Sequence, residues 1–273
     1  MSARLPLFLC CNGPRSHLAY CRPLFAQAAR SGLFDLVIGV GAGDEELVED
    51  LAGPGVVVAA SRLRTAEHGA VADLAHLAPE GWPRIRVWLG GSSEAPTCQW
   101  EDVRDAFERD LARLGLPTGF LEERVPMLDL SANGEPPRLD RPGIYLGNDR
   151  DGDPLCHFVF DLGRLAEALP DFDFWCTGGV DEPLENLRDA SSLSWRERAL
   201  LSESCEILVG STMEPLHVTL TEANRFKPRA ACGYDPRVRA PRWDYPGNPL
   251  ELLPGMDDLV DFLLANARAR CLA

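Results

Sequence analysis

Residues 206–233 read EILVGSTMEPLHVTLTEANRFKPRAACG and contain the pattern on which the fold prediction rests. The apolar run Ile207–Gly210 predicts a buried strand, and residues 211–214 predict a short turn after it. Pro215 favours the first turn of a helix, because the N–H that proline lacks is not needed there. The alanine-rich run Arg229–Cys232 predicts a second buried strand. This order of elements is typical of a parallel α/β sheet.

The turn between this strand and the expected helix predicts a site for an anion. Free backbone N–H groups and the positive end of a helix dipole converge where a helix begins, and this suits phosphate. Glu214 and His217 flank the turn in the sequence. Two structural alternatives remain open, in which Glu214 only caps the helix and His217 only packs on a neighbouring turn.

The composition is that of a globular protein with a strong negative charge. The chain has 273 residues, of which 45% are hydrophobic and 25% charged, and its net charge is −15. Without a clustered basic block, this charge argues against broad binding to nucleic acid or anionic membrane. A local basic groove around Arg237, Arg239 and Arg242 is the alternative. The length predicts two domains of ordinary size.

The cysteines and the N-terminus both favour a cytoplasmic protein. Nine cysteines are scattered without a CxxC pair, and most lie in apolar runs, where free cysteine behaves as a small hydrophobe. This usage suits a reducing compartment. We see no signal peptide, and no apolar run approaches the ~18 residues that a membrane span needs.

Both halves of the chain alternate short apolar runs with helical patterns. In the first half we expect strands at Leu5–Cys11, Phe34–Val40, Val56–Ala60 and 84–89, with helices following the first strand, at 44–51 and at 100–114. In the second half we expect strands at 144–147, 172–177, Ile207–Gly210 and Arg229–Cys232, with helices at 158–169, from Ser194 to about residue 204, from Pro215 and at 256–270. Ser194 and Glu197 form a capping box at the start of one of these helices.

This alternation predicts an α/β protein of two tandem Rossmann-like domains with a cleft between them. We expect an N-terminal acceptor domain at residues 1–135, a C-terminal donor domain at 142–273, and a linker within the Pro- and Gly-rich segment 126–142. Such sheets bind ligands at the carboxyl ends of their strands. The polar run 148–153 lines the cleft, binds a cation or forms a solvated turn.

Several familiar motifs are missing from the sequence. Neither half carries GxGxxG after a strand, which argues against a dinucleotide dehydrogenase. GxxxxGK[ST], GxSxG and HExxH are also missing, which argues against a P-loop NTPase, an α/β-hydrolase and a zinc metalloprotease. We therefore expect no metal site and no cofactor.

The second half resembles the heptosyltransferase-like GT-B glycosyltransferases of glycosyltransferase family nine. The resemblance lies in residues 187–189, in 194–198 and in the run from Cys205 to Gly233. The family has a turn of the type D-S-G-P-x-H, and here residues 212–217 read TMEPLH. Pro215 and His217 match, whereas Thr212, Met213 and Glu214 replace Asp, Ser and Gly. The first half resembles the family in architecture only.

The resemblance implies that the ligand is a nucleotide-activated sugar. Its diphosphate would lie on the backbone N–H groups at the start of the expected helix, without a metal ion. The implied donor-binding residues are Glu214, Pro215, Leu216, His217 and Lys227, with Arg225 as a further cation. Because the carboxylate of Glu214 repels phosphate, we expect it to meet the hydroxyls of the donor.

The resemblance also implies a catalytic base in the first half. Family members carry an Asp about six residues before a Pro in the first βα loop, where it takes the proton of the acceptor hydroxyl. His17 has that spacing from Pro23, and imidazole can carry out the same proton transfer at neutral pH. Arg15 is a candidate for binding an acceptor or phosphate oxygen. Helix capping or a surface position is the alternative for His17.

The sequence therefore predicts a glycosyltransferase, inverting and metal-independent, of hexosyl or heptosyl type. The alternatives are a non-catalytic nucleotide-sugar-binding protein and a sugar-nucleotide epimerase on the same fold. The acceptor is an unidentified hydroxyl, on a saccharide or on a modified nucleic-acid base. The sequence identifies neither the sugar, the nucleotide, the acceptor nor the oligomeric state.

Overall fold

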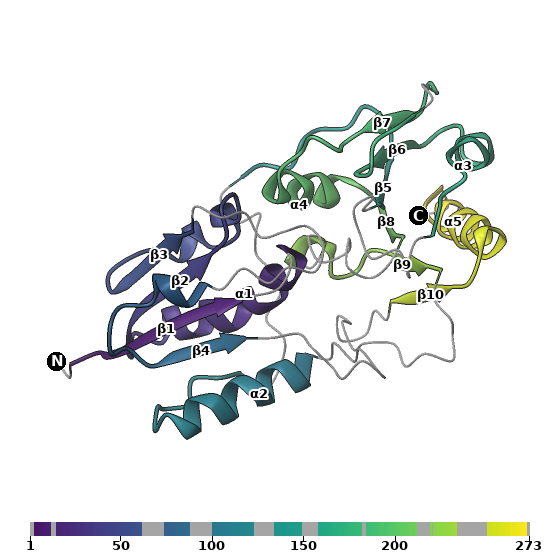
Figure 1. Ribbon diagram of the computed structural model, residues 1–273. Coiled ribbons are helices and arrows are strands. Elements are labelled where there is room, and N and C mark those ends of the chain that lie inside the picture. The colour runs from purple at the N-terminus through teal and green to yellow at the C-terminus, as the bar shows by residue number, and fades with distance from the viewer. Residues whose placement is uncertain are drawn as a thin grey trace. The chain divides into compact units, whose positions relative to one another are not determined.

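The computed structural model describes most of the chain, as two compact units at Met1–Met127 and Leu128–Ala273 (Figure 1). The described residues are 3–11, 15–61, 74–87, 100–122, 134–148, 158–181, 184–211, 219, 221–233 and 250–271. Within them, residues 15–17, 19–20, 100–103 and 268–271 are described by their backbone alone. In the described helices, no segment is both long and apolar enough to cross a membrane.

The first unit contains a parallel sheet of order β3-β2-β1-β4. Its elements are β1 (Leu5–Cys11), α1 (Arg15–Arg30), β2 (Phe34–Val40), η1 (Glu45–Leu47), η2 (Glu49–Leu51), β3 (Val56–Ala60), η3 (Leu74–Leu77), β4 (Arg84–Val87) and α2 (Trp100–Arg113). The central strand β1 is fully buried at Leu7, Phe8 and Leu9. The ring of Phe8 lies over Gly39 of β2, where an added Cβ would come within 2.6 Å of the ring.

One predicted helix of this unit is wrong. Residues 44–51 form two 3₁₀ turns, η1 and η2, separated by the non-helical backbone of Val48. The side chain of Arg22, from α1, explains the break, because its Nε donates to the Leu47 carbonyl over 2.7 Å. That carbonyl would otherwise accept the N–H of Leu51 in an α-helix. Arg22 also forms an ion pair with Asp50, which fastens both turns to α1.

The second unit contains a larger parallel sheet of order β10-β9-β8-β5-β6-β7. Its elements are β5 (Gly143–Gly147), α3 (Leu162–Ala168), β6 (Asp173–Cys176), β7 (Leu187–Asp189), α4 (Trp195–Ser204), β8 (Ile207–Gly210), η5 (Glu222–Asn224), β9 (Arg229–Cys232), β10 (Glu251–Leu253) and α5 (Met256–Cys271). Counted from β5 as strand 1 and read from β7, this order is 3-2-1-4-5-6. It is the strand order of a doubly wound Rossmann sheet.

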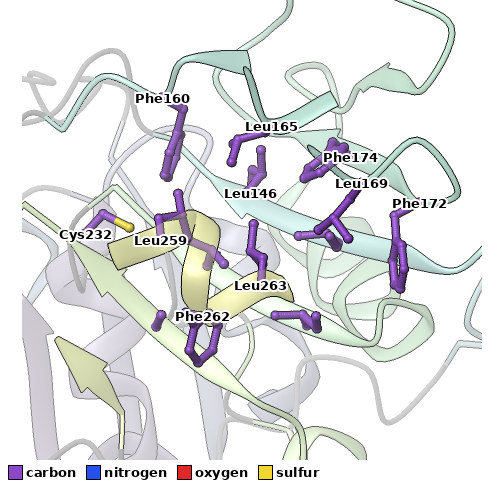
Figure 2. Packing of buried hydrophobic residues seen from close by; sticks show 14 of the residues in the cluster. Leu146, Phe160, Leu165, Leu169, Phe172, Phe174, Cys232, Leu259, Phe262 and Leu263 are labelled. Atoms are coloured by element: carbon purple, nitrogen blue, oxygen red, sulfur yellow. The ribbon is translucent and has the colours of Figure 1, made fainter. Parts of the chain in front are cut away.

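Helices cover both faces of this sheet. On one face, Leu259, Phe262 and Leu263 of α5 pack with residues of α3 and of the strands, as Figure 2 shows. On the other face, α4 contacts β5. The alternate strand positions Tyr145 and Leu208 are buried as well, although they lie outside the first cluster. Burial on both faces explains why the strands read as continuous apolar runs.

The predicted fold class is confirmed, since both units are parallel α/β sheets with helices between the strands. The capping box at the start of α4 is also present. In contrast, α3 begins four residues later than predicted, because Asp161 caps its first turn through a 3.0 Å bond from Arg164 N–H. Phe158 and Phe160 pair edge to face before it.

The helix expected from Pro215 begins outside the described residues. The part of its expected span that the structure describes contains the 3₁₀ turn η5 instead of an α-helix. Asn224, at the end of this turn, is bound by Ser202 of α4 and by the carbonyl of Thr219. The strands β7 and β10 were not predicted, because three residues are too few to show a periodic pattern.

Candidate functional site

The order of the second sheet reverses between β5 and β8, and both strands end there in glycine. Gly147 and Gly210 are the last pair in register. In doubly wound sheets, ligands bind outside the carboxyl ends of the strands at this switch point. The topology therefore marks this edge of the sheet as the candidate site.

Backbone contacts hold the strand ends together at this edge. The N–H of Ser211 donates to the Gly147 carbonyl over 2.7 Å, which extends the ladder one residue beyond β8. The N–H of Asn148 donates to the Thr177 hydroxyl oxygen over 2.9 Å. An added Cβ at Gly178 would lie 2.5 Å from the Asn148 carbonyl, so only glycine fits there. Among the described residues, the main chain is thus closely packed at this edge, which suits a ligand that approaches the main chain.

Ser211 is a residue of this edge that the sequence analysis did not select. Ser211 is 1% exposed, and its hydroxyl has no hydrogen-bond partner among the described residues. Trp175 Nε1 and Asn224 Oδ1 are also unpartnered. However, Trp175 lies within β6, and the Asn224 amide donates two hydrogen bonds elsewhere. A hydroxyl directly after a strand-ending glycine was the sequence signal for Ser211.

Four predicted donor-binding residues, Glu214, Pro215, Leu216 and His217, lie outside the described residues. The chain enters this segment from Ser211, at the carboxyl edge between β5 and β8. The segment therefore starts at the switch point, and the role of its side chains stays a prediction.

Arg15 and His17 lie in the first turn of α1, which follows β1. In the first sheet, the order 3-2-1-4 reverses between β1 and β4, so this turn also belongs to a carboxyl edge. Only the backbone of both residues is described, and their proposed roles stay predictions.

Lys227 lies at the opposite edge of the second sheet. It precedes β9 by two residues, and its ammonium donates to the carbonyls of Ser202 and Glu203, over 3.2 and 2.5 Å. These are carbonyls of the last turn of α4, which a lysine stabilises by hydrogen bonding and by its charge. The contacts therefore favour a helix-capping role, and the predicted phosphate contact of Lys227 gains no support from them. Arg225, nearby, contacts Glu222 and the ring of Phe226.

Other polar residues at this amino edge are paired as well. The buried carboxylate of Asp173 contacts Arg188 at 3.1 Å and Arg141 at 3.7 Å. The amide of Asn186 donates to the carbonyls of Ala166, Leu169 and Phe172, at the end of α3.

Two buried thiols of the second unit, Cys205 and Cys232, have raised pKa values. Burial raises the pKa of Cys232 to about 12, and burial also raises the pKa of Cys205. Both thiols are therefore protonated at neutral pH, and a thiol is a poor nucleophile and metal ligand. Within the described ranges, no group of three or more His, Cys, Asp or Glu side chains could hold a metal ion.

No protein-family model and no curated protein sequence matches this chain. Solved structures do match over nearly the whole length. An E. coli ADP-heptose LPS heptosyltransferase II has a TM-score of 0.59 at 13% identity, covering 97% of this chain and 99% of its own. E. coli heptosyltransferase WaaC, solved with ADP, has a TM-score of 0.56 at 13% identity, covering 97% and 98%.

A glycosyltransferase of family nine from Veillonella parvula is similar too, with a TM-score of 0.55 at 9% identity, covering 97% of this chain and 92% of its own. These structures have the GT-B arrangement of two Rossmann-like halves. The chain therefore has the GT-B fold in the form found in heptosyltransferases, and the fold implied by the sequence resemblance is confirmed.

Proposed function

We propose that this protein is a glycosyltransferase that moves a sugar from a nucleotide-diphosphate donor to an acceptor hydroxyl. The observation that carries the proposal is the match to two heptosyltransferases along 97% of the chain. Two further features support it: a switch point in each sheet, and a close-packed backbone edge in the second.

The second unit would bind the donor. The backbone N–H groups of Glu214, Leu216 and His217 would donate hydrogen bonds to the diphosphate of the nucleotide sugar. His217 would hydrogen-bond a phosphate or the sugar, and Glu214 the hydroxyls of the donor. The backbone N–H groups and His217 would stabilise the negative charge that develops on the departing diphosphate, without a metal ion.

The first unit would bind the acceptor. His17 would remove the proton of the acceptor hydroxyl, and Arg15 would bind a neighbouring oxygen of the acceptor or the donor. Attack by the hydroxyl oxygen on the anomeric carbon breaks the bond to the diphosphate and inverts the configuration. A base with a pKa near neutrality suits this proton transfer at cellular pH.

The test is turnover of nucleotide sugars by the wild type and by His17→Ala. The full-length protein is assayed for hydrolysis and transfer with ADP-, UDP-, GDP- and dTDP-sugars. Loss of a general base should lower kcat about 10²- to 10⁴-fold while the fold is retained. His76→Ala, which changes an exposed histidine of η3, serves as the matched control and should keep wild-type turnover.

Unchanged turnover in His17→Ala would remove His17 from the mechanism. Turnover that EDTA abolishes and Mg²⁺ restores would contradict metal independence. Retention of the anomeric configuration in the product would contradict inversion.

Binding without turnover is the second candidate. It is favoured by Thr212, Met213 and Glu214, which replace the Asp-Ser-Gly of the family's turn. A nucleotide-sugar-binding protein would respond to the donor in a thermal-shift screen, yet release no nucleotide with any acceptor. An epimerase would instead release an altered nucleotide sugar without an acceptor.

A further inference from the structure

The Ser211 hydroxyl stands out because of where it lies and because it is unpaired. It follows β8 directly, and the N–H of Ser211 still belongs to the ladder with Gly147. In a strand, alternate side chains share a face. Ser211 therefore continues the face of Ile207 and Val209, which pack in the apolar cluster with α3 and α5. The hydroxyl lies at the carboxyl end of this apolar layer.

An unpaired hydroxyl in such a place lowers the stability of the protein. Burial removes it from water, and no group of the described residues compensates the lost hydrogen bonds. Alanine or glycine would fill this position without that cost. Buried polar groups without a partner are few in native proteins, and they call for a water or a ligand as explanation.

The position of Ser211 indicates a ligand. Gly147 and Gly210 are the last pair at the switch point, and Ser211 is the next residue on β8. In doubly wound sheets a dinucleotide binds across the crevice at this switch point, with its pyrophosphate at the start of the helix after strand 1, the strand that β8 pairs with here. A phosphate oxygen accepts hydrogen bonds strongly, and a serine hydroxyl can donate one.

We infer that the Ser211 hydroxyl donates a hydrogen bond to a phosphate oxygen of the nucleoside-diphosphate part of the donor. This inference rests on the proposed function and adds a donor-binding residue to it. The hydroxyl is unpaired in the free protein because its partner arrives with the substrate. The serine is thus retained at the expense of stability, as binding residues often are.

The experiment compares Ser211→Ala with Ser202→Ala in the full-length protein. Ser202, on α4, is as deeply buried, but its hydroxyl is paired with the Ala199 carbonyl and the Asn224 amide. Isothermal titration with ADP, UDP, GDP and dTDP gives Kd, and calorimetry of the free proteins gives Tm. A second variant, Ser211→Cys, keeps the shape of the side chain but donates only weakly.

We expect Ser211→Ala to raise the Kd of the best-bound nucleotide about tenfold, because a hydrogen bond to a charged group is lost. Its Tm without nucleotide should equal or exceed that of the wild type, and Ser211→Cys should also raise Kd. Ser202→Ala should do the reverse, with a lower Tm and a Kd within twofold of the wild type.

The outcomes separate the inference from the proposed function. If the wild type binds none of the nucleotides, the proposed function fails and the inference fails with it. If the wild type binds and the Kd of Ser211→Ala lies within twofold of it, only the inference fails. If Ser211→Ala had a lower Tm than the wild type and an unchanged Kd, the hydroxyl would bind an internal water instead of the nucleotide, and the inference would fail.

Discussion

The two edges of the second sheet differ in how their polar groups are paired. At the amino edge, Asp173 contacts two arginines, Asn186 closes the end of α3 and Lys227 closes the end of α4. At the carboxyl edge, backbone contacts dominate, and the Ser211 hydroxyl has no partner.

Under the proposed function, one edge of this sheet would stabilise the fold and the other would bind the ligand. A side chain whose polar group is hydrogen-bonded to a helix end is not available to a ligand, whereas an unpaired hydrogen-bond donor at a switch point is. Lys227 illustrates this point, because it is the only lysine of the chain and its ammonium is bound by two carbonyls. The three predictions below test this division between the edges.

The largest effect is expected for Asn186→Ala at the amino edge. The variant removes the amide that donates to the carbonyls of Ala166, Leu169 and Phe172, of which the Leu169 carbonyl keeps the Phe172 N–H as a donor. It should lower the free energy of unfolding by about 2–3 kcal/mol. Urea denaturation measures this loss. Asn266→Ala on α5, which removes one hydrogen bond to Phe262, should change stability by less than about 0.5 kcal/mol.

The nucleotide affinity of Asn186→Ala is measured beside its stability. If folded Asn186→Ala lost affinity while its stability changed little, the amino edge would take part in binding and the division would be wrong.

A smaller effect is expected for Lys227→Met, which keeps the length of the side chain but removes its charge and its donors. The loss of two hydrogen bonds to the end of α4 should lower the free energy of unfolding by about 1–2 kcal/mol. The Kd for nucleotides should stay within twofold of the wild type.

The single lysine allows a direct observation as well. After reductive methylation with ¹³C-formaldehyde, one lysine signal should appear beside that of the chain's α-amino group. Saturating nucleotide should not change the chemical shift of this lysine signal. A clear shift of this signal, together with a raised Kd in Lys227→Met, would return Lys227 to the phosphate site.

The smallest effect is expected at the capping box of α4. The Ser194 N–H, and then its hydroxyl, bind the Glu197 carboxylate and lower its pKa below the usual value of about 4.3. The stability from this pair is therefore present above that value and is lost as pH falls through the lowered pKa. Ser194→Ala should cost about 1 kcal/mol at pH 7 and flatten the loss of stability between about pH 5 and 3.

Glu197→Gln is the matched variant for this prediction, because its amide can accept the same hydrogen bonds but does not titrate. If the acid limb of the stability curve were equally steep in the wild type and in both variants, the pair would not contribute to it.

Much of the fold was predictable because its signals are local. Leu5–Cys11, Phe34–Val40 and Ile207–Gly210 have the predicted bounds, since each is an apolar run that ends at a turn residue or a glycine. One of the errors has a non-local cause. Residues 44–51 do not form an α-helix because Arg22, more than twenty positions away, binds the Leu47 carbonyl.

The candidate site was predictable only in part. The segment that contains Glu214 to His217 follows from the sequence pattern and lies outside the described residues, which end before it at Ser211, next to the switch point. Ser211 was passed over, because whether a hydroxyl is paired depends on groups that meet it only in the folded chain. Lys227 was assigned to phosphate from its charge, and its contacts with α4 were not visible in the sequence.

The sequence by itself determined the class of fold, two parallel α/β halves, because burial on both faces leaves continuous apolar runs that can be read along the chain. Tertiary structure decided the strand order 3-2-1-4-5-6, and with it the edge where a ligand can bind. It also decided which polar groups are paired and that the Ser211 hydroxyl is not. The reason is physical: apolar patterns are local, whereas hydrogen-bond partners come from distant parts of the chain.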